Sequence, residues 1–260
     1  MPVFGGKTAG SSHTAKGLPC QDAFRFEITE RREIIVAVAD GLGSAKHSET
    51  GALKAVNSAV DKIKSIFEEG RLYDTPVAGM MKNRDIVKEA FYSARESLEE
   101  YSKETGLPIK ALACTLIVVF TYEGFITTGH IGDGAVVAEK EGNITIISFP
   151  GESEYINEVT PLTAGKIDEN IRINENIPGV EAFAVFSDGC QRAFLQRKEG
   201  EYTPYEPFFR PFFSYAKGLA DEEKASKEIA GFLESKKMME NSDDDKTLVI
   251  AVMDRGDRDI

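Results

Sequence analysis

Aspartates stand beside apolar segments at several places in this sequence, usually with a glycine directly after them. The dipeptide Asp-Gly occurs at residues 40–41, 133–134 and 188–189, each time after an apolar run, and an Asp-rich run at 243–245 precedes another. Asp22 comes just before a segment of alternating apolar residues. A single Asp-Gly is a common turn, because aspartate hydrogen-bonds its own backbone and glycine accepts a positive φ. Three such pairs beside predicted strands favour one shared site over three unrelated turns.

Carboxylates gathered at one edge of a sheet would bind hard divalent cations. Acidic groups held close together repel one another unless a cation lies among them, and Mg²⁺ and Mn²⁺ prefer oxygen ligands. A pair of such ions binds phosphate oxygens and activates a water for in-line attack, so that no side-chain nucleophile is needed. The pattern therefore predicts a metal site with two or more ions that acts on phosphoesters.

Other catalytic chemistries fit the sequence less well. Three histidines, His13, His47 and His130, are too few for a His-rich zinc site. Cys190 lacks the loop of glycines and arginine that a cysteine-dependent phosphatase needs, and Gly41–Ser44 lacks the Gly-Lys-Ser/Thr ending of a nucleotide-binding loop. Because it lies just before the first motif, His13 is a candidate to act on the phosphate or the leaving group, with a local structural hydrogen bond as the alternative.

Composition indicates a globular protein whose main partner is not nucleic acid. The chain has 260 residues, of which 42% are hydrophobic and 28% charged, with a net charge of −12. A nucleic-acid partner would require a basic face. Three cysteines without a CxxC pair fit a reducing compartment. Since the chain shows neither a signal peptide nor an apolar run of membrane-spanning length, we expect a soluble, cytoplasmic protein with no membrane partner.

Periodicity predicts an α+β fold that would hold these aspartates. Glu33–Ala39 and Ala113–Phe120 predict buried strands, and the closely spaced apolar runs that follow favour antiparallel hairpins. Apolar residues at spacings of three and four predict helices from Ser48 onward and over 83–101, and a helical region spans 207–239. Strands and helices in such blocks indicate antiparallel sheets stacked face to face and covered by helix pairs.

One domain is expected over residues 1–260, because no internal repeat or low-complexity linker divides the sequence. Residues at about 150–180 are polar, with Gly, Asn and Pro throughout, and predict an irregular, flap-like excursion. The remaining strands are expected at Gly124–His130, Ala135–Glu139, Ile144–Phe149, Ala182–Phe186 and Thr247–Met253.

The motifs, taken in order, resemble those of the type 2C metal-dependent serine/threonine protein phosphatases. They are QDA at 21–23, VADGLGS at 38–44, GDG at 132–134, SDG at 187–189 and DDKT at 244–247. The N-terminal stretch GSSHTAKGLPCQDAF resembles the bacterial branch of that family in particular. The resemblance spans most of the chain.

This resemblance implies an α-β-β-α sandwich of two antiparallel sheets, in agreement with the periodicity. It also implies two core divalent ions, Mg²⁺ or Mn²⁺, bridged by Asp40, with the carbonyl of Gly41 as a ligand of one. The other acidic positions have roles in the same scheme: Asp188 and Asp244 as ligands of the other core ion, Asp22 as the holder of metal-bound waters, and Asp133 as the ligand of a third, weaker ion.

Three positions depart from the family pattern. Family members often carry an arginine that grips the substrate phosphate five residues before the aspartate of the first motif, and that position is Gly17 here. Lys16 or His13 is expected to replace it, although lysine offers a point charge rather than a bidentate fork. Leu42 stands where eukaryotic members have a histidine, and Gln21 where many members have glutamate.

The resemblance implies hydrolysis of phosphoserine and phosphothreonine in proteins by a hydroxide that bridges the two core ions over Asp40. A metal-bound water or His13 would protonate the leaving alkoxide. The expected partners are phosphoproteins, modified by an opposing Ser/Thr kinase, and the oligomeric state is not indicated. Because Gly17 replaces the arginine, a catalytically weak binding or sensing protein on the same fold is the alternative, and a hydrolase of small phosphoesters is a third.

Overall fold

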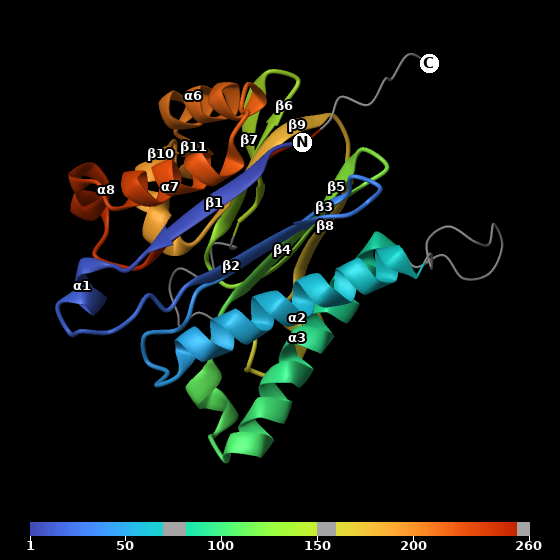
Figure 1. Cartoon of the computed structure of the whole chain (residues 1–260), viewed down its shortest axis with the longest axis vertical. Coiled ribbons are helices and arrows are strands. Elements are labelled where there is room, and N and C mark those ends of the chain that lie inside the picture. The colour runs from blue at the N-terminus through green and yellow to red at the C-terminus, as the bar shows by residue number, and fades with distance from the viewer. Residues whose placement is uncertain (70–81, 150–159, 254–260) are drawn as a thin grey trace.

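The structure is a computed structural model that describes residues 1–69, 82–149 and 160–253. Two five-stranded sheets lie face to face, and helices cover the outer face of each (Figure 1). All neighbouring strands within these sheets are antiparallel. The predicted α-β-β-α sandwich of the α+β class is therefore confirmed.

One sheet, called here the β1 sheet, has the strand order β1-β12-β9-β6-β7, and the other, the β2 sheet, has the order β2-β3-β4-β5-β8. The strands of the β1 sheet are β1 (Val3–Thr8), β12 (Lys246–Val252), β9 (Val180–Phe186), β6 (Ala135–Lys140) and β7 (Asn143–Ser148). Those of the β2 sheet are β2 (Ala23–Ile28), β3 (Ile34–Ala39), β4 (Leu116–Tyr122), β5 (Phe125–Ile131) and β8 (Arg172–Ile177).

Two long helices cover the β2 sheet, and three shorter ones lie over the β1 sheet (Figure 1). The long pair is α2 (Ser48–Glu68) and α3 (Asn83–Thr105), which extends beyond the predicted 83–101 and is capped by Gly106. The helices over the β1 sheet are α6 (Glu206–Lys217), α7 (Glu222–Leu233) and α8 (Lys236–Asn241), which divide the predicted helical region. Short elements complete the described fold: α1 (Ser11–Thr14), η1 (Ile109–Leu112), α4 (Ile167–Asn170), η3 (Asp188–Cys190), α5 (Gln191–Phe194), β10 (Leu195–Lys198) and β11 (Glu201–Pro204).

Strand β3 shows how the layers are held together. Ile34, Val36 and Val38 point into the core between the two sheets, whereas Ile35 and the alanines that alternate with them point toward α2 and α3. A strand that is covered on both faces needs a continuous apolar run, which is why this segment lacks the polar alternation of an exposed strand. Burying each large aliphatic side chain contributes roughly 1.5–3 kcal/mol, so the strand that ends at Asp40 is firmly anchored.

Part of the segment predicted to be irregular, about 150–180, is regular. Residues 150–159 lie outside the described residues, and α4 follows after a turn. Arg172–Ile177 then forms β8 and pairs with β5 at the edge of the β2 sheet, so the prediction is wrong for these residues. Their sequence, RINENI, is polar because an edge strand stays half-exposed.

The predicted hairpins are present. Tyr122 pairs with Phe125, and Lys140 pairs with Asn143, so each connection is a two-residue Glu-Gly turn. Among the described residues, no helix is both long enough and apolar enough to cross a bilayer.

Candidate metal centre

Four of the predicted aspartates lie at strand ends that meet at one edge of the sandwich. Asp22 precedes β2 and Asp40 follows β3, and the residues next to them, Ala23 and Ala39, are paired across the β2 sheet. In the β1 sheet, β6 begins just after Asp133 and β9 ends just before Asp188, and these two strands are also neighbours. Each sheet therefore delivers two carboxyl groups to the same edge.

Three of these carboxyl groups form a tight cluster, called here the Asp cluster: Asp40, Asp133 and Asp188. One carboxylate oxygen of each lies within 4.8 Å of the others, and all three residues are partly exposed. Like charges at this separation repel strongly where solvent is largely excluded. The site therefore favours either protons or cations among its carboxylates.

The pKa values of the site carboxyls show this repulsion. Burial raises the pKa of Asp188 to about 8, and the charges of Asp133 and Asp244 act in the same direction. Burial also raises the pKa of Asp40 well above its usual range, and the charges of Asp22 and Asp188 are the next largest causes of this increase. Carboxyl groups that resist ionisation in the metal-free protein bind a cation in place of a proton.

Asp22 is held beneath the Asp cluster by two hydroxyl groups. Its Oδ2 accepts hydrogen bonds from Ser187 Oγ and Thr247 Oγ1, each at 2.7 Å. Burial raises its pKa to about 6, while its hydrogen bonds with Asp40, Ser187 and Thr247 act to lower it. Asp22 thus joins the β2 sheet to the strand ends of the β1 sheet.

The donor set fits a divalent cation. The Oδ1 atoms of Asp22 and Asp188 are buried and have no hydrogen-bond partner among the described residues. Buried polar atoms are normally satisfied, so an orphaned carboxylate oxygen inside an acidic cluster indicates a missing ligand. Because the side-chain donors of the cluster are all carboxylate oxygens, the ligand they suit is a hard ion such as Mg²⁺ or Mn²⁺.

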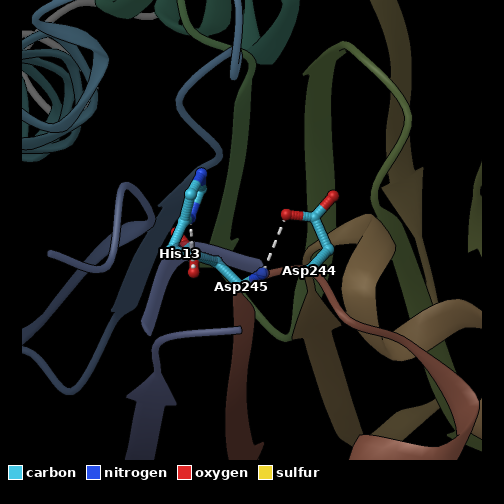
Figure 2. Close-up of side chains that lie close together, drawn as sticks. All are labelled: His13, Asp244 and Asp245. Atoms are coloured by element: carbon cyan, nitrogen blue, oxygen red, sulfur yellow. Dashed lines mark hydrogen bonds and ion pairs between the residues drawn. The ribbon is translucent and has the colours of Figure 1, made fainter. Parts of the chain in front are cut away.

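Asp244 lies beside the Asp cluster but belongs to a second group. This group contains His13, Asp244 and Asp245, and each offers one possible ligand atom within 4.8 Å of the other two (Figure 2). Since the charge of Asp244 raises the pKa of Asp188, the two groups are neighbours. The structure therefore brings three of the predicted metal ligands, Asp40, Asp133 and Asp188, together in one set and places Asp244 in an adjoining set, while Asp22 and Gly41 belong to neither.

The positions with a predicted role in phosphate binding differ in their surroundings. His13 is largely buried, whereas Lys16 is exposed in the turn after α1. Gly17 has a φ of 67°, a backbone conformation that side chains rarely adopt. An arginine at this position would be strained, which explains why glycine stands here. Gly41, whose carbonyl was a predicted ligand, follows Asp40 and forms an isolated bridge with Cys114.

Several residues that shape the site received no role from the sequence. Asp245, Ser187 and Thr247 lie inside the motifs, so their position there was a usable signal. Gln191 donates its Nε2–H to the carbonyl of Asp133, and Arg172 donates from Nη2 to the carbonyl of Gly132 at 2.6 Å. These last two contacts join distant segments, and no local pattern indicates them.

Replacing Gly189 with alanine should lower the free energy of unfolding by about 1–3 kcal/mol, the usual range for overpacking. A Cβ on Gly189 would collide with the carbonyl oxygen of Asp245, pushing apart the loops that carry Asp188 and Asp244. Urea denaturation measures the change. Gly231→Ala is the matched control, because nothing lies within 4 Å of that position in α7 and alanine favours a helix. Equal stability of the two variants would contradict the close approach.

The fold and the site together define an α-β-β-α sandwich with a cluster of carboxylates at one edge. Residues 9–234 match the family model of protein phosphatase 2C. The chain therefore belongs to the protein phosphatase 2C family and is a serine/threonine protein phosphatase. Membership of this family implies divalent metal ions, for which the Asp cluster is the candidate site.

Bacterial phosphatases are found both among similar sequences and among solved structures of the same fold. The chain is 28% identical over 251 residues to serine/threonine-protein phosphatase 3 of Escherichia coli (strain K12), covering 94% of this chain and 95% of that protein. A bacterial serine phosphatase of known structure superposes with a TM-score of 0.60 at 12% identity, covering 98% of both chains. Stp1 of Staphylococcus aureus gives a TM-score of 0.56 at 13% identity, covering 98% of this chain and 96% of that one. Identities this low show a shared fold.

Proposed function

We propose that residues 1–260 form a single catalytic domain that hydrolyses phosphoserine and phosphothreonine in proteins. The observation that carries this proposal is the convergence of the Asp cluster, whose carboxylates come from both sheets and lie within 4.8 Å of one another. The name of the E. coli relative supports the substrate class. The substrates would be phosphoproteins modified by an opposing Ser/Thr kinase.

The proposed ion ligands follow from the two adjoining sets. Asp40 and Asp188 would serve the two core ions together with Asp244 and the carbonyl of Gly41, and Asp133 would serve a third, weaker ion. When bound, Mg²⁺ or Mn²⁺ supplies Lewis-acid charge to the phosphoryl oxygens and activates a water for in-line attack.

The chain's own residues position the reactants. Asp22, locked by its two hydroxyl donors, accepts hydrogen bonds from water at the centre and so orients it. His13 and Lys16 are the proposed contacts for the substrate phosphate. Without cations, the carboxylates of the Asp cluster would repel a phosphate dianion. Substrate binding should therefore depend on the ions as strongly as the chemistry does.

Turnover of a phosphoserine peptide should require Mn²⁺ or Mg²⁺, stop on addition of excess EDTA and return when the cation is restored in excess. The measurement is phosphate release with each cation, with EDTA, and after restoration. A panel of small phosphometabolites run in parallel tests the narrower substrate class, because a protein phosphatase should prefer the peptide. Undiminished turnover in EDTA would contradict the metal centre.

One observation favours the alternative of a catalytically weak binding or sensing protein. The turn at Gly17 does not suit the phosphate-gripping arginine of related proteins. That alternative predicts Mn²⁺ binding in calorimetry without phosphate release from any phosphopeptide. Measurable metal-dependent turnover would exclude this alternative and support the proposed enzyme.

A further inference from the structure

Asp245 is a buried carboxylate for which the proposed metal scheme has no use. It is 1% exposed. Its Oδ1 accepts a hydrogen bond from the backbone N–H of Gly10 at 2.7 Å, and its Oδ2 accepts one from the N–H of Gln21 at 2.5 Å. Two backbone donors stabilise the ionised form of a carboxyl group. Asp245 therefore ties both ends of the loop over residues 10–21 to the start of β12.

The same carboxylate faces His13. Nδ1 of the imidazole lies 2.9 Å from Oδ1 of Asp245 (Figure 2). The two atoms are in contact without the geometry of a hydrogen bond. With Nδ1 turned toward Asp245, the ring nitrogen that remains available is Nε2.

His13 belongs to the group of side chains next to the Asp cluster. In Figure 2 the second ring nitrogen of His13 points away from Asp245, and the side chain keeps 11% of its surface exposed. His13 also has a nitrogen within 4.8 Å of a carboxylate oxygen of Asp244, whose charge acts on Asp188. Asp244 thus links the ring of His13 to the Asp cluster.

We propose that Asp245 is a positioning residue that holds His13 so that its Nε2 faces the phosphoryl group of the substrate. This inference rests on the proposed phosphatase function. His13 would replace the arginine that the turn at Gly17 does not accommodate. Lys16 suits the task less well, because it is exposed on that turn.

A metal ion held jointly by His13, Asp244 and Asp245 is the competing explanation of this cluster. Each oxygen of Asp245 already accepts a backbone N–H, which leaves little capacity for a cation. A buried carboxylate that orients an imidazole is a well-known arrangement in protein sites. The two explanations differ in the number of ions bound, which can be measured.

The test compares His13→Gln, Asp245→Asn and the double variant in the full chain. With Mg²⁺ at saturation, each single variant should weaken binding of inorganic phosphate in calorimetry and lower kcat/KM for a phosphoserine peptide. The expected loss is about tenfold to a hundredfold, the range for a hydrogen bond to a charged group. The double variant should be no worse than His13→Gln alone, because Asp245 acts through the ring. His47→Gln, at the start of α2, is the matched control and should behave as the native chain.

If the loss in the double variant equals the product of the two single losses, the proposal is wrong. Asp245→Asn would then act by loosening the loop over residues 10–21, an effect that does not depend on whether His13 is present. So would unchanged phosphate affinity in His13→Gln, or the loss of one bound Mn²⁺ from that variant. A separate readout is ¹⁵N NMR of the histidine rings in the metal-free chain. The His13 signals of the native chain should change in Asp245→Asn and stay the same in His47→Gln.

The proposed function and this inference fail in different ways. A native chain without turnover contradicts the phosphatase proposal, whereas the phosphate-binding and NMR measurements still decide the pairing of His13 with Asp245. Turnover that is unaffected by His13→Gln contradicts the inference and the proposed phosphate contact of His13, but not the proposed hydrolysis.

Discussion

Asp188→Asn should abolish cation-dependent phosphate release while giving a metal-free protein that is more stable than the native chain at pH 8. Asp188 contributes to the cluster an oxygen that has no hydrogen-bond partner among the described residues, so a neutral amide removes a proposed ion ligand. Losing several kcal/mol of charge stabilisation corresponds to a loss of turnover of about a thousandfold or more. The measurement is release of an aryl phosphate with Mn²⁺ at saturation.

The gain in metal-free stability has an electrostatic cause. Burial raises the pKa of Asp188 to about 8, and the charges of Asp133 and Asp244 raise it further, so its ionised form opposes folding. The amide carries no charge to repel these neighbours. The expected gain at pH 8 is on the order of a few kcal/mol. Asp40→Asn should behave in the same way, since the pKa of Asp40 is also raised.

Asp168→Asn is the matched control for this pair of effects. Asp168 lies in α4 and is exposed, and its bonds to Lys88 and Tyr92 lower its pKa. This variant should keep full turnover and gain no stability. If Asp188→Asn retained native activity, or unfolded more easily than the native chain without metal, the proposed role of the Asp cluster would be wrong.

The local sequence was enough to predict the individual residues of the Asp cluster. An apolar run followed by Asp-Gly indicates both the end of a strand and an aspartate at that end. Asp40, Asp133 and Asp188 could therefore be identified one by one. Predicting that these three residues converge also required the order of the strands in the sheets. That order came from the resemblance of the motifs to a known family. Strand β8 escaped prediction because an edge strand carries a polar sequence that periodicity does not separate from a loop.

The rest of the site depends on contacts that no local pattern records. Asp245 and Gln21 are 224 positions apart, yet the carboxylate of one accepts the backbone N–H of the other. The sequence shows three consecutive aspartates at 243–245 and gives no reason to separate their roles. Burial separates them: Asp243 is exposed, Asp244 half-buried at the metal centre, and Asp245 buried against His13.

The metal-free protein should lose stability as the pH rises from about 4 to about 8, and divalent cations should remove or reverse this slope. The folded-state pKa is about 6 for Asp22 and about 8 for Asp188, and that of Asp40 is also raised. The unfolded chain titrates near the ordinary aspartate value, about 3.9. Between these values the folded state binds more protons than the unfolded state, so the free energy of unfolding falls as the pH rises.

Cations act in the opposite direction because they compete with protons for the same oxygens. At pH 8 the carboxylates are available, and an ion that binds only the folded state stabilises it by mass action, by about 2.7 kcal/mol at a hundred times its dissociation constant. At pH 5 protons occupy the site and the same concentration of Mn²⁺ should stabilise the fold much less. Chemical denaturation at pH 5, 6, 7 and 8, with EDTA and with Mn²⁺, measures both effects.

Asp188→Asn shows whether these carboxylates cause the slope. In that variant the metal-free slope should flatten, most clearly between pH 6 and pH 8, because the carboxyl group of residue 188, whose pKa is raised to about 8, no longer titrates. Asp168→Asn should leave that interval unchanged, since the pKa of Asp168 is lowered and the group is ionised throughout it. A native chain whose metal-free stability rises between pH 6 and pH 8 would show that the Asp cluster is ionised without cost, and the site would then need cations neither for charge balance nor for folding stability.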